Sequence, residues 1–283
     1  MFADLHLHTR FSDGTFTPEE LVENAARAGL QAIALTDHDT MDGCPRAAAA
    51  CDAAGLEFIP GTELTAEHDG QELHLLGYWL DLGAPGLADE LRHFQQVRQR
   101  RIAEMVTRLN EQGIPLTAQA VLELANCEAP GRPHLARALV AGGHVRDYDT
   151  AFDKYLKKGR PGWVPKARLE ASRAIDLIHR AGGVAVLAHP GLYRQDSLIP
   201  KLAAEGIDGL ECWHTKQGPE ASARYVRLAG ELGLVATGGS DCHGNSKGQP
   251  LIGTLRIPYE QVDALRARRP TTPPSPSPGA APA

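Results

Sequence analysis

The stretch that decides the fold lies at the N-terminus and reads Asp4-Leu5-His6-Leu7-His8-Thr9-Arg10-Phe11-Ser12-Asp13. If residues 3–8 form a strand, its period of two places Asp4, His6 and His8 on one face and the two leucines on the other. Asp13 is followed by a glycine, a pair typical of a tight turn, so its carboxylate can fold back toward the two imidazoles. The stretch therefore predicts a metal site at the end of a strand.

Composition narrows the class of protein without naming a function. The 283 residues are 42% hydrophobic and 23% charged, which is ordinary for a globular chain of two domains or of one barrel with an insertion. The chain has no apolar run of about 18 residues and no room for a signal peptide before Asp4, so we expect a cytoplasmic protein with no membrane contact. Five cysteines without a C-x-x-C pair argue against disulfides and against a thiolate zinc site. No feature indicates an obligate protein partner.

Alternating strand and helix patterns predict βα units along most of the chain. The expected strands are 31–36, 56–63, 72–80, 184–189, 207–212 and 234–238, and the expected helices are 17–29, 44–54, 170–181, 197–205 and 220–232. This alternation predicts an α/β fold with a parallel sheet or barrel.

The alternation breaks between residues 88 and 168. A long helical pattern covers residues 88–112, and shorter ones follow around 118–124, 133–141 and 149–156. We interpret residues 88–168 as a helical insertion, here called the cap. The expected domains are a barrel formed by residues 1–87 and 169–269, the cap, and a disordered Pro-rich tail over residues 270–283.

Charge is distributed unevenly between these parts. Residues 88–170 carry 14 Lys and Arg against 10 Asp and Glu, whereas the whole chain carries 29 against 35. A basic cap beside an acidic body suits an anionic substrate held over bound cations. A solvated basic face on the cap helices would explain the charge equally well.

Residues of the types that bind metals recur at or just past the ends of the expected strands. They are His6, His8, Asp13, His38, Glu63, His189, Asp241 and His243, with His74 near the start of its strand. In barrels of parallel strands this rim is where active sites are assembled. Singly, each residue has an ordinary alternative, such as a turn carboxylate at Glu63 or a core histidine at His74. Jointly they predict a metal site.

Two further positions near this set have other expectations. Asp37 and Asp39 flank His38 and could either support a ligand or cap a helix. Cys242 alternates away from its neighbours Asp241 and His243 in an extended chain, so we do not expect it to bind a metal.

The ordered set H-x-H, Asp13, T-D-H-D, G-x-E, a strand histidine, A-H-P and S-D-x-H resembles the polymerase and histidinol phosphatase (PHP) family. The resemblance covers nearly the whole barrel. It implies a distorted (β/α)7 barrel that holds two or three divalent metal ions. The implied metal ligands are His6, His8, Asp13, His38, Glu63, His74, His189, Asp241 and His243. Among them it implies catalytic roles for Asp13, Glu63, His189 and Asp241, with Glu63 bridging two ions.

Motifs in the cap narrow the resemblance. Gly131-Arg132-Pro133-His134 and the basic run from Tyr155 to Gly162 look like the cap of PHP phosphoesterases that act on 3′,5′-nucleotide bisphosphates, and of the related enzyme that trims short RNA from its 5′ end. The candidate substrate-binding residues in these motifs are Arg132, His134, Lys157 and Arg160. His214, three residues past Glu211 at the end of an expected strand, is a further candidate that could bind phosphate or protonate the leaving oxygen, or could be an ordinary surface histidine. Without the resemblance, the motifs read as the first turn of a helix and as a solvated basic loop.

The predicted function is hydrolysis of the 3′-phosphate of 3′,5′-nucleotide bisphosphates, together with 5′-end trimming of short RNA. Imidazole and carboxylate ligands without thiolate suit Mn²⁺, which we favour, or Fe²⁺ or Zn²⁺. Two alternatives remain open at this point. The protein could be a histidinol-phosphate phosphatase, or a non-catalytic scaffold stabilised by metal.

Overall fold

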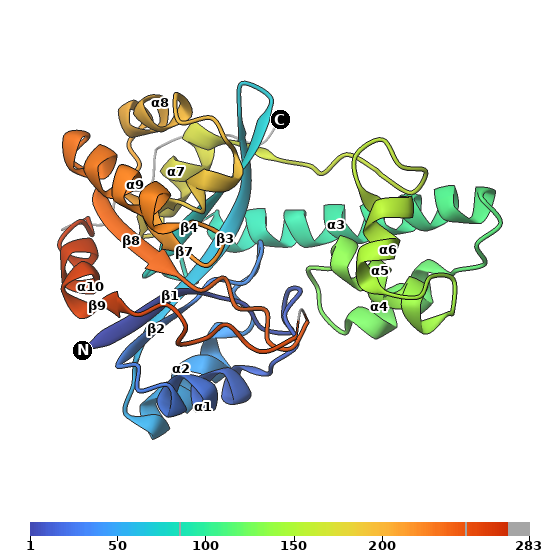
Figure 1. The fold of residues 1–283 in the computed structure, drawn as a ribbon, viewed down its shortest axis with the longest axis horizontal. Coiled ribbons are helices and arrows are strands. Elements are labelled where there is room, and N and C mark those ends of the chain that lie inside the picture. Colours follow the sequence, from blue (N-terminus) through green and yellow to red (C-terminus); the bar gives the residue numbers. More distant parts are fainter. Residues whose placement is uncertain (85, 247, 271–283) are drawn as a thin grey trace.

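The computed structural model describes residues 1–84, 86–246 and 248–270. Its sheet curls into a nearly closed barrel, and the helices of the cap project from one side of this barrel (Figure 1). The predicted α/β fold with a distorted barrel is confirmed. All but the first residue of the tail expected at residues 270–283 lies outside the described residues.

The barrel is built from seven strands in the order β8-β7-β6-β4-β3-β2-β1. They span Phe2–Leu7 (β1), Ala32–Leu35 (β2), Glu57–His68 (β3), Gln71–Tyr78 (β4), Val184–Leu187 (β6), Gly209–His214 (β7) and Val235–Gly239 (β8). Two short strands, β5 (Leu169–Glu170) and β9 (Ile257–Pro258), pair with β3 and β1. These two were not expected from the sequence.

The two ends of the sheet meet where β1 lies beside the segment that follows β8. The amide of Asp241 donates to the carbonyl of His6 at 2.9 Å, and the amide of His8 donates to the carbonyl of Cys242 at 3.0 Å. Gly239 allows this approach, because a Cβ atom there would lie 2.3 Å from the Cβ of His6. The opening stretch of the chain is therefore joined directly to its late S-D-x-H motif.

Strand β4 departs from the parallel sheet that the alternation predicted. It runs antiparallel to both of its neighbours, β3 and β6. The reason is local: only Asp69 and Gly70 connect β3 to β4, both with positive φ, and such a two-residue turn joins antiparallel strands. Because β4 runs the opposite way, it begins at the rim where the parallel strands end. This explains why His74, near the start of its strand, lies with the other ligand candidates.

Helices cover the outside of the barrel and close one end. They are α1 (Pro18–Arg27), α2 (Cys44–Ala54), α7 (Ala171–Arg180), α8 (Leu198–Glu205), α9 (Pro219–Glu231) and α10 (Tyr259–Arg266), with a 3-10 turn at Pro190–Leu192. Helix α1 begins at the predicted capping box of Thr17 and Glu20. One face of the strands packs against α1, α2, α7, α8 and α9, and the other packs with α10. Helix α10 was not predicted.

The cap contains α3 (Leu87–Glu111), α4 (Ala118–Ala125), α5 (Arg132–Ala141) and α6 (Tyr148–Ala151), which continues as a π-helical turn over Phe152–Leu156. Leu91 and Phe94 in the first half of α3 belong to the barrel core. Met105 and Leu109 in its second half pack instead with Leu135 of α5 in a separate apolar cluster. Helix α3 therefore carries the cap on the barrel through two distinct hydrophobic cores.

Two expectations from composition can be compared with the structure. All five cysteines have free thiols, and only Cys127 is not buried. Within residues 1–84, 86–246 and 248–270, no helix combines the length and apolar character needed to cross a bilayer.

Candidate metal centre and substrate pocket

The carboxylate of Glu63 lies at the centre of a group of imidazoles. Its Oε2 atom lies 3.0 Å from Nδ1 of His38 and 3.3 Å from Nε2 of both His6 and His8. Its other oxygen, Oε1, lies 2.6 Å from Nδ1 of His74 and 2.9 Å from Nε2 of His189. The two oxygens of one carboxylate thus face two different sets of histidines.

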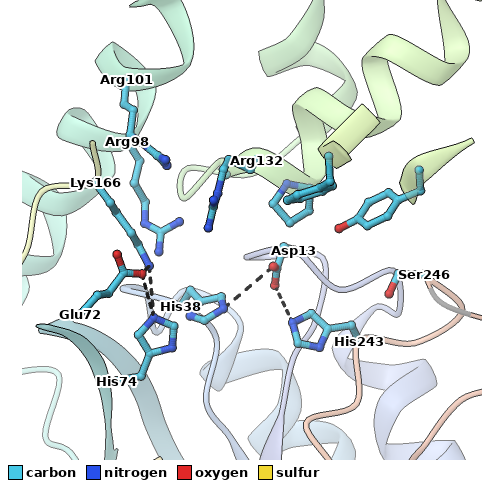
Figure 2. Close-up of a pocket in the computed structure, with 14 residues that line it drawn as sticks. Asp13, His38, Glu72, His74, Arg98, Arg101, Arg132, Lys166, His243 and Ser246 are labelled. Atoms are coloured by element: carbon cyan, nitrogen blue, oxygen red, sulfur yellow. Dashed lines mark hydrogen bonds and ion pairs between the residues drawn. The ribbon is translucent and has the colours of Figure 1, made fainter. Parts of the chain in front are cut away.

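Asp241 and Asp13 extend this centre on one side. Asp241 Oδ1 lies 3.3 Å from His8 Nε2 and 3.7 Å from His6 Nε2. Asp13 Oδ1 lies 3.1 Å from His243 Nε2, and its Oδ2 lies 3.9 Å from His38 Nε2 (Figure 2). The barrel thereby brings together all nine residues predicted as metal ligands.

The donors fall into overlapping groups that could hold metal ions. One group joins His8, Asp13, His38 and His243, a second joins His6, His8 and Asp241, and a third joins His38, Glu63 and His74. His189 is outside these three groups but bonds to Glu63. Only imidazole nitrogens and carboxylate oxygens take part, a donor set suited to first-row divalent ions.

Buried polar atoms in this centre also fit a metal. Within the part of the chain that the structure describes, several donor atoms here are buried without a hydrogen-bond partner. They are His6 Nε2, both ring nitrogens of His8, Asp13 Oδ1, His38 Nδ1 and Glu63 Oε2. Leaving such atoms unpaired in a protein interior is costly, and coordination to cations would satisfy them.

The electrostatics of the centre favour bound cations. Burial alone would raise the pKa of Glu63, but the imidazoles around it, led by His38, hold that pKa well below its usual range. Burial lowers the pKa of His38 to about 4. Burial also opposes protonation of His8, yet the carboxylates of Asp241 and Glu63, each with an oxygen 3.3 Å from its Nε2, raise its pKa to about 10. Ionised carboxylates that stabilise a proton on a neighbouring imidazole this strongly would equally stabilise a metal ion.

Several residues hold the ligands in place without being among them. Glu211 of β7 is fully buried, with Oε1 2.9 Å from His6 Nδ1 and Oε2 accepting the amide of His189 at 2.6 Å. A carboxylate on the second ring nitrogen orients a metal-binding histidine. The sequence signal for Glu211 was only its place on a strand.

The ambiguity at Asp37 and Asp39 is resolved, because neither caps a helix. Asp37 accepts hydrogen bonds from Thr9 and from Ser12 Oγ, so it braces the loop that leads to Asp13. Asp39 bonds to β3 and to the cap, as described below. The N-cap residue of the following helix, α2, is Gly43.

A pocket of about 230 Å³ opens directly over the metal centre, between barrel and cap. Its floor includes Asp13, His38, His74 and His243 (Figure 2). Four positive side chains lie along one side, and we call them the cationic wall: Arg98, Arg101, Arg132 and Lys166. Tyr148 and Phe152 of the cap also line the pocket.

Arg132 is the one predicted substrate-binding residue that lines this pocket. His134 is buried, and its Nδ1 accepts the amide of Gly131. Lys157 is exposed and paired with Asp153, and it lines a neighbouring pocket that shares Tyr148 and Phe152. Arg160 is exposed as well.

His214 occupies a different place from the other candidates. It is buried below the pocket, and its Nε2 lies 3.3 Å from Oδ2 of Asp241. It therefore contacts a predicted metal ligand.

The sequence interpretation missed most of the cationic wall. Arg98 and Arg101 are three residues apart, which places them on one face of α3, and both are largely buried. Their spacing was visible in the sequence, but only the docking of α3 on the barrel covers that face. Lys166 lies in the segment between the π-helical turn (Phe152–Leu156) and β5, where no periodic pattern marks it, and its Nζ lies 3.3 Å from Nε2 of His74.

Known proteins resemble this chain over most of its length. The family model described as PHP domain matches residues 4–160. The chain is 37% identical to the 5′-3′ exoribonuclease Rnm of Salmonella typhimurium over 247 residues, which cover 85% of this chain and 84% of that protein. It is 35% identical to the 3′,5′-nucleoside bisphosphate phosphatase of Chromobacterium violaceum over 256 residues, or 88% and 90% of the two chains.

Two solved structures superimpose on nearly the whole chain. A candidate metal-dependent phosphoesterase from Bifidobacterium adolescentis superimposes with a TM-score of 0.87 at 35% identity, covering 94% of this chain and 96% of the other. An amidohydrolase from Chromobacterium violaceum with bound sulfate and no metal has a TM-score of 0.82 at 32% identity, with 93% and 97% covered.

Proposed function

Because this chain belongs to the PHP domain family of metal-dependent phosphoesterases, we propose that it removes the 3′-phosphate from nucleoside 3′,5′-bisphosphates and trims short RNA from the 5′ end. The observation that carries the proposal is the cationic wall directly above a centre of nine metal-ligand candidates. One phosphate can lie at the centre while a second pairs with the wall.

The nine candidates would hold two or three divalent ions, of which we favour Mn²⁺, with Fe²⁺ and Zn²⁺ as alternatives. Such ions lower the pKa of a bound water and neutralise the oxygens of a phosphoryl group. Glu63 suits a bridging position, because its two oxygens face different histidines. Asp13, His189 and Asp241 complete the proposed catalytic set, and His214 would hold Asp241 in position.

The reaction at the two substrates is the same. A water oxygen bonds to phosphorus, the bond from phosphorus to the 3′ oxygen breaks, and the 3′ oxygen leaves with a proton. In a bisphosphate the products are a nucleoside 5′-monophosphate and phosphate. In RNA the same cleavage releases the first nucleotide, because the 3′-phosphate is there esterified to the next residue.

The pocket walls suit the remaining parts of the nucleotide. Arg98, Arg101 and Arg132 offer guanidinium groups that can bind a 5′-phosphate with paired N–H donors. Tyr148 and Phe152, whose ring centroids are 5.0 Å apart, offer aromatic surface for a base. We also propose that the barrel (residues 1–87 and 169–269) supplies the chemistry and that the cap (residues 88–168) supplies substrate selection.

The test is to purify the protein with Mn²⁺ and to follow the release of products from three substrates: adenosine 3′,5′-bisphosphate, a short 5′-phosphorylated RNA, and histidinol phosphate. We expect turnover of the first two. A clear preference for histidinol phosphate would replace the proposal with that activity. Bound metal without turnover of any of them would identify a metal-stabilised scaffold instead.

A further inference from the structure

Asp39 lies between the metal centre and the cationic wall. Its side chain is fully buried, and its backbone has a φ of 51°, a left-handed conformation that is unusual for a residue other than glycine. The amide of Asp39 donates to the carbonyl of Glu63 at 3.1 Å. Oδ1 accepts the amide of Thr65 at 2.7 Å, and Oδ2 accepts its hydroxyl at 2.9 Å. Asp39 is therefore bonded to β3 through both its backbone amide and its carboxylate.

The same carboxylate reaches across to the cap. Oδ2 of Asp39 accepts Nε of Arg98 at 2.8 Å and Nη2 of Arg98 at 2.6 Å. Nη1 of Arg98 donates to the carbonyl of Pro130 at 3.4 Å. A guanidinium has five N–H donors, so these contacts leave one donor on each Nη nitrogen. Arg98 lines the pocket, and Figure 2 shows its guanidinium above His38 and His74.

The arrangement orients the guanidinium before a ligand arrives. Arg98 is only 7% exposed, so an unpaired charge at this place would be costly, and Asp39 compensates it. A long side chain held in one orientation loses little further freedom when it binds an anion. Neither Arg101 nor Arg132 has a carboxylate partner among the ion pairs of the described residues.

We propose that Asp39 is a positioning residue that fixes Arg98 to receive the second phosphate of the substrate, and that this pair makes the enzyme prefer nucleotides carrying that phosphate. The proposal rests on the proposed function, since it concerns the same pocket. It assigns different duties to the two aspartates that flank His38: Asp37 braces the metal-ligand loop, and Asp39 braces the substrate-binding side.

The experiment compares adenosine 3′,5′-bisphosphate with adenosine 3′-monophosphate, which lacks the 5′-phosphate. In Asp39→Asn the amide oxygen can still accept from Thr65, but the charge that holds Arg98 is lost. We expect KM for the bisphosphate to rise about tenfold, as for loss of a charge-assisted hydrogen bond. The kcat for both substrates and KM for the monophosphate should change less than about twofold, and the metal content should stay that of the wild type.

A second variant keeps the test valid if Asp39→Asn folds poorly. Arg98→Lys retains the positive charge but removes the forked donor geometry, and it should produce the same selective rise in KM. In the double variant the two effects should not add, because both remove one interaction.

The matched control is Glu90→Gln. Glu90 pairs with Arg173 of α7 at 2.8 Å. This ion pair also joins α3 to the barrel, but neither residue lines the pocket. It should leave the preference between the two substrates at its wild-type value. If this control shifts the preference as much as Asp39→Asn does, general loosening of α3 is responsible and the positioning role is wrong.

Four other results would overturn the inference. Equal losses on both substrates, or loss of metal from Asp39→Asn, would mean that Asp39 only supports His38. A lower KM for the bisphosphate would mean that the carboxylate repels the phosphate more than it positions Arg98. Turnover of neither substrate by the wild-type protein would instead reject the proposed function, and the inference with it.

Discussion

The barrel rim and the cationic wall face each other across one pocket, but they are built differently. The side chains of the rim project from the ends of buried strands. The backbone at His189 and at Asp241 is left-handed, with φ of 31° and 53°. Such strained conformations persist where the surrounding structure holds them firmly. Wall side chains are long and come from α3, α5 and the segment before β5. The difference fits the proposal that the strand ends supply the chemistry and that the long cationic side chains supply substrate choice.

The largest expected effect comes from breaking the rim. We predict that Asp241→Ala, or His8→Ala, lowers turnover by at least about 10³-fold, because each removes a candidate metal ligand that contacts two or more other candidates. Circular dichroism should show a retained fold, and metal analysis should show reduced occupancy. Wild-type rates in either variant would show that the site is assigned wrongly.

The gain in thermal stability on metal binding should depend on the rim and not on the cationic wall. At 100 times its Kd, an ion that binds only the folded state stabilises it by about 2.7 kcal/mol, which raises Tm by about 5 °C or more for a chain of this size. Differential scanning fluorimetry with and without Mn²⁺ measures this shift after treatment with a chelator. Arg132→Ala should keep the shift and His8→Ala should lose most of it. Equal shifts in both variants would contradict the division between rim and wall.

Breaking the wall should change substrate preference more than chemistry. Arg132 lines the pocket from the first turn of α5, so Arg132→Ala should lower kcat/KM for adenosine 3′,5′-bisphosphate by about tenfold. Hydrolysis of a small phosphate ester such as p-nitrophenyl phosphate should fall much less. Losses of the same size on both substrates would rule out a substrate-binding role.

The smallest effect is expected outside the pocket. Lys157 is exposed and lines the neighbouring pocket beside Tyr148 and Phe152, where the continuing strand of an RNA could pass. Lys157→Ala should weaken binding of short RNA by about two- to threefold at low salt and less at high salt, since it removes one contact to phosphate. The mononucleotide should be nearly unaffected. A larger loss of activity on adenosine 3′,5′-bisphosphate than on short RNA would instead place Lys157 within the substrate pocket.

Local patterns in the chain predicted the barrel elements well. The helix from Cys44 to Ala54 has the predicted bounds, and α1 begins at Thr17 as its capping box indicated. These features depend on interactions within a few residues, which a sequence displays directly. The direction of a strand was harder to predict. Strand β4 lies where the sequence predicted a strand, but it is antiparallel, because the two-residue turn at Asp69 and Gly70 reverses the chain.

In the cap, the helices were predicted better than the residues that line the pocket. Its helices were expected near their observed positions, yet Lys157 and Arg160 lie outside the pocket, whereas Arg98, Arg101 and Lys166 line it. The sequence shows which residues are basic but not which helix face meets the barrel. That face is set by the docking of α3, through contacts between residues far apart in the chain.

The sequence by itself determined the set of candidate metal donors, because metal binding requires particular side chains and they recur at strand ends from His6 to His243. Only the tertiary structure decided how they are shared, with Glu63 between two groups of histidines and Asp39 turned toward the cap. The physical reason is that the type of each side chain, and so its ability to bind a metal, is written in the sequence. The direction in which each side chain points depends on packing between residues far apart in the chain. Closure of β1 on the segment after Gly239 is the contact that turns the opening motif into a site.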